Sequence, residues 1–177
     1  MPQKLKRLIL LTIFITLIIP NIAYAEVPLK TVPFNVKVTD LKNKEDILNN
    51  LEQIKTIRKN LTTIDIRASS SQEQLQTADE HLRNYIQQME SIIAKLKNHI
   101  NTYTGSLSDE FFSEQVILIA RGYIISLRYQ QLLVGELQRN TPEAKELSYS
   151  SYLITIYFNM TRSDQMIAYI DTYLTYS

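Results

Sequence analysis

The chain has 177 residues, of which 19 are lysine or arginine and 18 are aspartate or glutamate, giving a formal net charge of +1. This balance provides no bulk electrostatic attraction to nucleic acid or to an anionic membrane surface. The absence of cysteine excludes disulfides, a cysteine nucleophile and attachment of lipid to a cysteine behind the leader.

Residues 1–25 have the pattern of a secretory signal peptide. Three basic residues precede an apolar run over 8–19, and small residues at Ala23 and Ala25 match a signal peptidase site. As a helix the run would reach roughly 18 Å, short of a hydrocarbon core of about 30 Å. We therefore expect cleavage after Ala25 and an extracytoplasmic location: the periplasm, the cell envelope or the medium. The alternative is an uncleaved anchor.

Cleavage would leave 152 of the 177 residues, enough for one domain with a substantial core. The leader holds three basic residues and no acid, so the mature chain carries 16 basic and 18 acidic residues and a net charge of −2. We expect no membrane span after cleavage.

Residues 26–42 differ in composition from the rest. Pro28 and Pro33 disfavour a helix, and Phe34, Val36 and Val38 alternate with polar residues. This pattern predicts an extended arm or linker, with a short strand as the less supported interpretation.

From residue 43 onward, apolar residues recur at helical spacing and predict four helices, at about 43–67, 71–104, 108–139 and 142–176. Ser70 and Glu73 fit a capping box, Gly105 and Ser108 separate the second helix from the third, and Pro142 opens the fourth.

Long helices joined by short breaks predict an all-α fold, an antiparallel up-down-up-down four-helix bundle preceded by the extended arm. The alternative, in which the first two helices form one long hairpin arm, is disfavoured by the three serines at 69–71.

The sequence contains no recognisable catalytic, cofactor or metal motif. Three glycines are too few and too scattered for a phosphate loop, and neither His81 nor His99 has the glutamate of an E-x-x-H metal motif. We expect His81 to be solvated and His99 to be a hydrogen-bonded residue at the rim of the core. Asp164 and Asp171 lie one heptad apart, without a recognisable partner for acid–base chemistry. We therefore predict a protein that is not an enzyme and uses no cofactor.

The third helix carries more apolar residues than one bundle face needs. Leu118, Ile125 and Leu132 form a separate stripe at seven-residue spacing, beside Arg121 and Arg128. In a simple four-helix bundle this stripe would face water, which is typical of an interface. The arm over 26–40, a second copy of the chain or a foreign partner would then cover it. The alternative is a rotated helix in which the stripe is ordinary core.

Tyrosines concentrate near the C-terminus, where Tyr152, Tyr169 and Tyr173 join the candidate interface. Tyrosine is enriched at protein interfaces because it offers a large apolar ring with a polar tip. Packing at the rim of the core is the alternative role.

These observations lead to the hypothesis of an exported, non-enzymatic bundle that binds another protein, or itself, through the third helix. The first alternative is a carrier of a small apolar ligand or lipid held between helices. The second is an enzyme without a recognisable motif.

Overall fold

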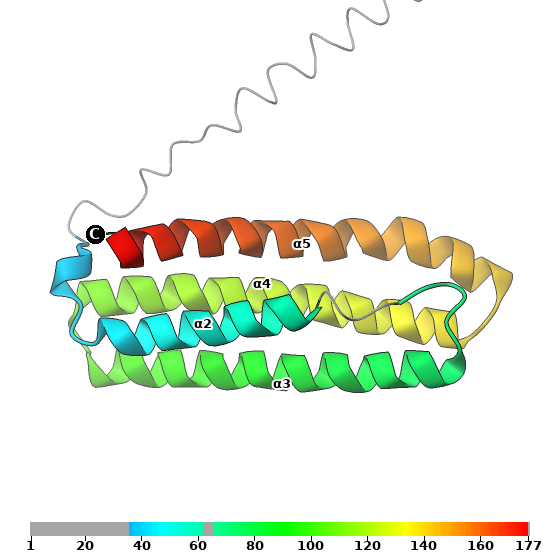
Figure 1. Ribbon diagram of the computed structural model, residues 1–177, viewed down its shortest axis with the longest axis horizontal. Helices are drawn as coiled ribbons and strands as arrows, with labels where there is room; N and C mark the ends of the chain where they lie inside the picture. Colours follow the sequence, from blue (N-terminus) through cyan, green and yellow to red (C-terminus); the bar gives the residue numbers. More distant parts are fainter. Residues whose placement is uncertain (1–35, 62–65, 177) are drawn as a thin grey trace, which may run out of the picture. The chain divides into compact units, whose positions relative to one another are not determined.

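A computed structural model of the protein describes residues 36–61 and 66–176, apart from the side chains of 142–151 and 176. These residues form four α-helices, one turn of 3-10 helix and no strand (Figure 1). In chain order the elements are η1 (Val38–Asp40), α2 (Lys44–Leu61), α3 (Gln72–Thr102), α4 (Leu107–Gln138) and α5 (Pro142–Tyr176). The predicted all-α, four-helix arrangement is confirmed.

Successive helices run in opposite directions. At the start of α3, Gln72 donates a hydrogen bond to the backbone carbonyl of Gln138 at the end of α4, at 3.0 Å. At the end of α3, the ring of His99 lies 2.9 Å from Asp109 in the first turn of α4. The helices of Figure 1 follow the same alternation along the chain.

The shortest helix, α2, packs along part of the length of the other three. It has 18 residues, whereas α3, α4 and α5 have 31, 32 and 35. Lys55 and Arg58 of α2 form ion pairs with Asp171 and Asp164 of α5, at 2.6 and 2.8 Å. In Figure 1, α2 ends well before the right-hand end of its neighbours.

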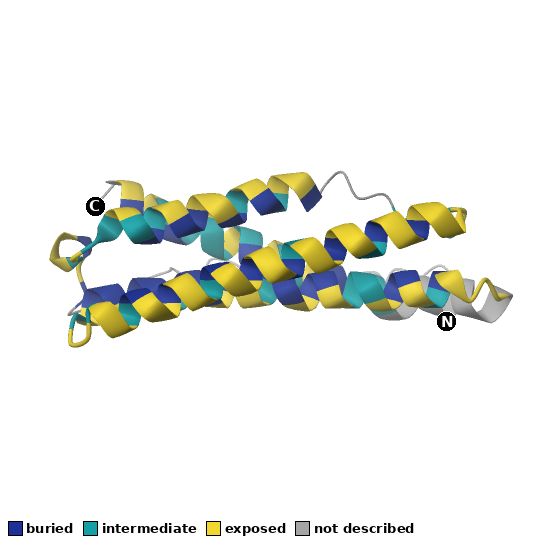
Figure 2. Cartoon of the chain, turned by 90° about the horizontal axis from the view of Figure 1, so that it is seen from below, coloured by how far each residue is buried: buried dark blue, intermediate teal, exposed yellow. Residues whose placement is uncertain are grey.

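Apolar side chains from all four helices meet between them because each helix repeats its apolar residues every three or four positions. Figure 2 shows these buried residues as stripes along the helices. The largest fully buried side chains are Tyr123, Phe112, Ile47, Leu51, Ile54, Leu82, Met89, Ile92, Leu96, Ile117, Ile119 and Leu127.

The break between α2 and α3 differs from its prediction in two details. The helix predicted to reach 67 is described as far as Leu61, and Arg67 does not belong to it. In the turn over 67–70, the backbone N–H of Arg67 donates to the hydroxyl of Ser70, and the backbone N–H of Ser70 donates to the carbonyl of Arg67. Because Ser70 serves this turn, the capping box forms one residue later, between Ser71 and Gln74. Its two hydrogen bonds measure 3.2 and 2.8 Å.

The start of α4 also lies earlier than predicted. Gly105 adopts a φ of +88°, which reverses the chain after α3 as expected for a glycine there. Ser106, rather than Ser108, is the N-cap and accepts a hydrogen bond from the backbone N–H of Asp109 at 3.4 Å. Ser108 is buried and accepts a hydrogen bond from the backbone N–H of Lys37 at 3.3 Å.

The extended conformation predicted for 26–42 does not continue to the end of that segment. Lys37 is extended, but Val38–Asp40 form one turn of 3-10 helix. Val36 and Val38 are buried, and the backbone N–H of Lys42 bonds Asp109 at 2.9 Å, so this part of the chain packs against the start of α4. The rest of the arm, up to residue 35, and the predicted signal peptide over 1–25 lie outside the described residues.

Candidate functional site

The rotation of α4 is defined by a buried tyrosine. The hydroxyl of Tyr123 donates a hydrogen bond of 2.5 Å to Asp164, which also receives two hydrogen bonds from Arg58 of α2. Tyr123 therefore faces α2. Residues two positions apart on a helix differ by about 200°, so Ile125 faces away from α2.

Leu118 and Leu132 lie seven residues before and after Ile125 and share its side of the helix. The exposed fractions of Leu118, Ile125 and Leu132 are 43%, 44% and 53%. We call these three residues the α4 stripe. The alternative in which α4 is rotated and the stripe belongs to the core is therefore wrong. Leu107, 45% exposed and eleven positions before Leu118, continues the same line to the first residue of α4.

Two arginines border the α4 stripe on the side of α3. Arg128 forms an ion pair with Glu90 of α3 at 3.1 Å. Arg121 lies one heptad earlier on the same side, is exposed, and has no ion-pair partner among the residues that the structure describes. Glu114, one heptad earlier again, is half-buried.

The rotation of α5 places a second set of side chains on the same face. Ser163 faces α4, because its hydroxyl donates to the backbone carbonyl of Ile119 at 3.3 Å. Asp164 faces α2. Arg162 lies two positions earlier, about 200° around the helix, so it points away from α2 and is exposed. Tyr169 follows Arg162 by one heptad and therefore shares its line on the helix.

The predicted tyrosines pair with one another or with α4. The rings of Tyr169 and Tyr173 are 4.9 Å apart in an edge-on contact. The ring of Tyr152 lies 6.2 Å from that of Tyr129, which stands four residues after Ile125. The contact with Tyr129 places Tyr152 beside the α4 stripe, and the heptad relation of Tyr169 to the exposed Arg162 places Tyr169 on the outward side of α5.

All eight predicted interface residues thus lie on or beside the face of α4 and α5 that is turned away from α2. We call it the outer face. Sequence reasoning missed three of its members: Leu107, Tyr129 and Arg162. Their spacing of eleven, four and seven residues from Leu118, Ile125 and Tyr169 was the available signal.

A groove between α3 and α4 continues the outer face beyond the α4 stripe. Its volume is about 620 Å³. It is lined by Asp79, Arg83, Arg128, Gln131, Leu132, Val134, Gly135 and Gln138. A Cβ added at Gly135 would meet no atom within 4 Å, so the groove is open at this point.

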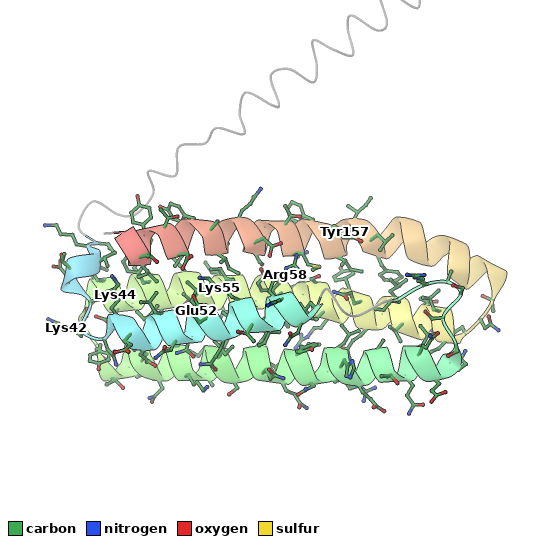
Figure 3. All side chains as sticks on the ribbon, in the orientation of Figure 1. Lys42, Lys44, Glu52, Lys55, Arg58 and Tyr157 are labelled. Atoms are coloured by element: carbon green, nitrogen blue, oxygen red, sulfur yellow. The ribbon has the colours of Figure 1, made fainter. Side chains whose placement is uncertain are left out.

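A smaller pocket lies at the C-terminal end of α2. It has a volume of about 300 Å³, and Arg58 and Tyr157 stand among a mainly apolar lining (Figure 3). The remaining lining residues are Leu61, Ile66, Gln130, Leu133, Leu153, Ile156 and Met160. This pocket corresponds to the ligand-carrier alternative.

Asp164 is a structural anchor beside this pocket. Burial would raise the pKa of its carboxyl, but the hydrogen bonds from Arg58 and Tyr123 outweigh burial and hold the pKa below its usual range. Burial and the bond to Asp164 raise the pKa of the Tyr123 hydroxyl, which therefore remains a donor. The sequence could not reveal these partners because they lie on other helices.

His99 is also structural. Its side chain is fully buried, so the predicted position at the rim is wrong, although the predicted hydrogen bonding is present. Nδ1 lies 2.8 Å from Asp46 and Nε2 lies 2.9 Å from Asp109. Burial would raise the pKa of Asp109, but hydrogen bonds, chiefly from Ser106 and the backbone of Lys42, lower it overall. The cluster joins α2, α3 and α4.

His81, by contrast, is exposed as predicted. Among the side chains that the structure describes, no group of three or more histidine, aspartate or glutamate residues is placed to hold a metal ion. No helix in the described part of the chain combines the length and apolar character needed to cross a membrane.

Fold and site together define a four-helix bundle with an exposed apolar stripe bordered by arginines and tyrosines. No family model matches the chain, and no match was found among curated proteins or solved structures.

Proposed function

We propose that this chain is an exported, non-enzymatic bundle that binds another protein through its outer face. The observation that carries the proposal is the exposure of Leu118, Ile125 and Leu132, at 43–53%, on a helix whose opposite side is fully buried. Contiguous exposed apolar side chains on a folded domain are typical of a surface that another protein covers.

The composition around the stripe supports the same function. Tyrosine and arginine are among the residues most often found where a few side chains carry most of the binding energy. Tyr152 and Tyr169 flank the stripe on one side, and Arg121 flanks it on the other. The secretory pattern of residues 1–25 supports a place of action outside the cytoplasm.

The test is site-specific crosslinking in the native cell envelope, followed by mass spectrometry. A photo-crosslinker at Leu132 should capture a defined protein, and one at Ile154, which is 75% exposed on the far side of α5, should not. The double change Leu118→Ser, Ile125→Ser should abolish this capture while the urea midpoint stays close to that of the parent.

The pair Ile154→Ser, Tyr157→Ser removes exposed apolar side chains elsewhere on α5 and serves as the matched control. Unchanged capture by Leu118→Ser, Ile125→Ser, or the same captured proteins from both crosslinker positions, would contradict the proposal.

The pocket of about 300 Å³ at the end of α2 favours a second candidate function, the carriage of a small apolar ligand. A carrier should bind a hydrophobic dye when folded and release lipid on extraction. Met160→Glu, which places a charge in the pocket lining, should abolish dye binding. Dye binding that survives this change would exclude the pocket as the site.

A further inference from the structure

We infer that the partner presents an amphipathic helix to the outer face, with acidic side chains on both sides of its apolar residues. The inference rests on the proposed function and specifies the chemistry of the partner. It combines three features of the described residues: the spacing of the α4 stripe, the groove that follows it, and two arginines without acidic partners.

The spacing of the α4 stripe matches the surface repeat of an α-helix. Leu118, Ile125 and Leu132 repeat every seven residues over a length of about 21 Å along α4. A helix packed nearly parallel or antiparallel to α4 returns the same side of its surface every seven residues, so its apolar residues meet the stripe repeatedly. A strand repeats every second residue and would not match this spacing.

The groove gives such a helix room to continue past the stripe. Leu132 belongs both to the α4 stripe and to the groove between α3 and α4, so the two surfaces are continuous. Gly135 follows Leu132 by three residues and therefore lies on the same side of α4, next to the end of the stripe. No atom lies within 4 Å of where its Cβ would stand, so a docked helix can approach the backbone of α4 closely there.

At the level of Gly122, both charged side chains that flank the stripe are basic, whereas Glu114 lies one heptad earlier toward the start of α4. At this level the flanks favour acidic side chains on the partner. Arg121 borders the stripe on the side of α3, and Arg162 borders it on the side of α5. A Cβ at Gly122 would lie 2.2 Å from the hydroxyl of Ser163, so these two residues stand at the same level along the bundle. Arg121 and Arg162 immediately precede them in the chain and therefore share that level.

Neither Arg121 nor Arg162 has an ion-pair partner among the residues that the structure describes, whereas Arg83 and Arg128 are paired with Asp79 and Glu90. A docked helix with glutamate or aspartate on each flank would therefore meet one unpaired guanidinium group on each side. Pairing of this kind selects a partner and its orientation more than it adds affinity.

The experiment uses two synthetic helical peptides as probes for the full mature chain. Both carry leucine at heptad spacing, one with glutamate on the flanks and the other with lysine. Fluorescence anisotropy at low salt should show about tenfold tighter binding of the glutamate peptide, the difference expected from two exposed charge pairs. Arg121→Glu, Arg162→Glu should reverse this preference. Lys42→Glu, Lys44→Glu around the start of α2, on the side from which the outer face is turned away, should leave it unchanged.

The outcomes separate this inference from the proposed function. Equal affinities, both lost in Leu118→Ser, Ile125→Ser, would overturn the acidic partner but leave the outer face as a binding surface. Binding of neither peptide would overturn the helical partner, and the crosslinking experiment would then decide the proposed function independently. Sedimentation of the chain alone tests a second copy as the occupant, and a dimer abolished by Leu118→Ser, Ile125→Ser would overturn the inference.

Discussion

At the scale of single residues, His99 joins three helices of the bundle through its side chain. Its two ring nitrogens contact Asp46 of α2 and Asp109 of α4. Both contacts are within hydrogen-bond distance, and a ring nitrogen that carries a hydrogen donates it to the carboxylate oxygen that it faces. Removing the ring would leave two carboxylates, one of them fully buried, without the hydrogen-bond partner that they share.

We therefore expect His99→Ala to lower the free energy of unfolding by about 2–5 kcal/mol, because it leaves a cavity in place of the buried ring and a buried Asp109 oxygen without its partner. Urea denaturation at pH 7 measures this loss. His81→Ala, at an exposed position of the same helix, is the control and should stay within about 0.5 kcal/mol of the parent. Equal effects of the two changes would contradict the structural role of His99.

Asp164 should contribute to the decrease in the free energy of unfolding at low pH. Its folded-state pKa is lowered, so the ionised carboxyl stabilises the fold above the unfolded-state pKa of about 3.9, and this stability is lost as the pH falls through the folded value. Because its side chain is 40% exposed, we expect Asp164→Asn to cost only about 1–2 kcal/mol at pH 7.

The free energy of unfolding of Asp164→Asn should also fall less than that of the parent between about pH 5 and pH 2. Chemical denaturation across this range measures both profiles. Asp40→Asn, at an exposed position of η1, should reproduce the profile of the parent. If the free energy of unfolding decreased with falling pH as steeply in Asp164→Asn as in the parent, the ion pair with Arg58 would add no stability.

At the scale of helices, the close contact between α4 and α5 depends on a glycine. A Cβ at Gly122 would lie 2.2 Å from the Ser163 hydroxyl, which would have to turn away and give up its hydrogen bond to Ile119. A Cβ at Gly135 would meet nothing within 4 Å, so alanine there gains helix propensity without a clash.

We expect Gly135→Ala to stabilise the protein by about 0.5–1 kcal/mol and Gly122→Ala to be about 1–3 kcal/mol less favourable than Gly135→Ala. Adding Ser163→Ala to Gly122→Ala should recover part of the loss, because the clashing oxygen is removed. Urea midpoints of the single and double variants measure this coupling. Additive effects at positions 122 and 163 would show that the two helices are not in contact there.

Helices were easier to predict than the points where they begin and end. Apolar spacing of three and four residues indicates a helix over any long segment, so all four helices were predicted. The caps were displaced because several serines compete at each break, and the choice depends on contacts elsewhere in the chain. Ser70 is taken by a turn with Arg67, and Ser108 is taken by the backbone of Lys37.

At the scale of the whole molecule, the composition of the outer face could be predicted only in part. Heptad spacing gives the angular position of Leu118, Ile125 and Leu132 on their own helix, so their separation from the core was visible in the sequence. The meeting of this stripe with the tyrosines of α5 was not visible, because it depends on how α5 is rotated against α4. That rotation is defined by Ser163 and Gly122, which are 41 positions apart in the chain.

We expect the molecule to reach its place of action without its first 25 residues. The small residues Ala23 and Ala25 follow a basic leader and an apolar run, so we expect exported protein to begin at Glu26. Cleavage there would remove none of the described bundle, whose first residue is Val36. N-terminal sequencing and intact mass of the exported material measure the cleavage site.

Ala25→Phe should block processing and leave the chain tethered, since a large side chain does not fit the position that the peptidase reserves for small residues. Tyr24→Phe, which changes the position between the two small residues, is the matched control and should be processed normally. Recovery of intact peptides spanning residues 1–30 from most of the exported parent protein would show that the leader is retained and acts as an anchor.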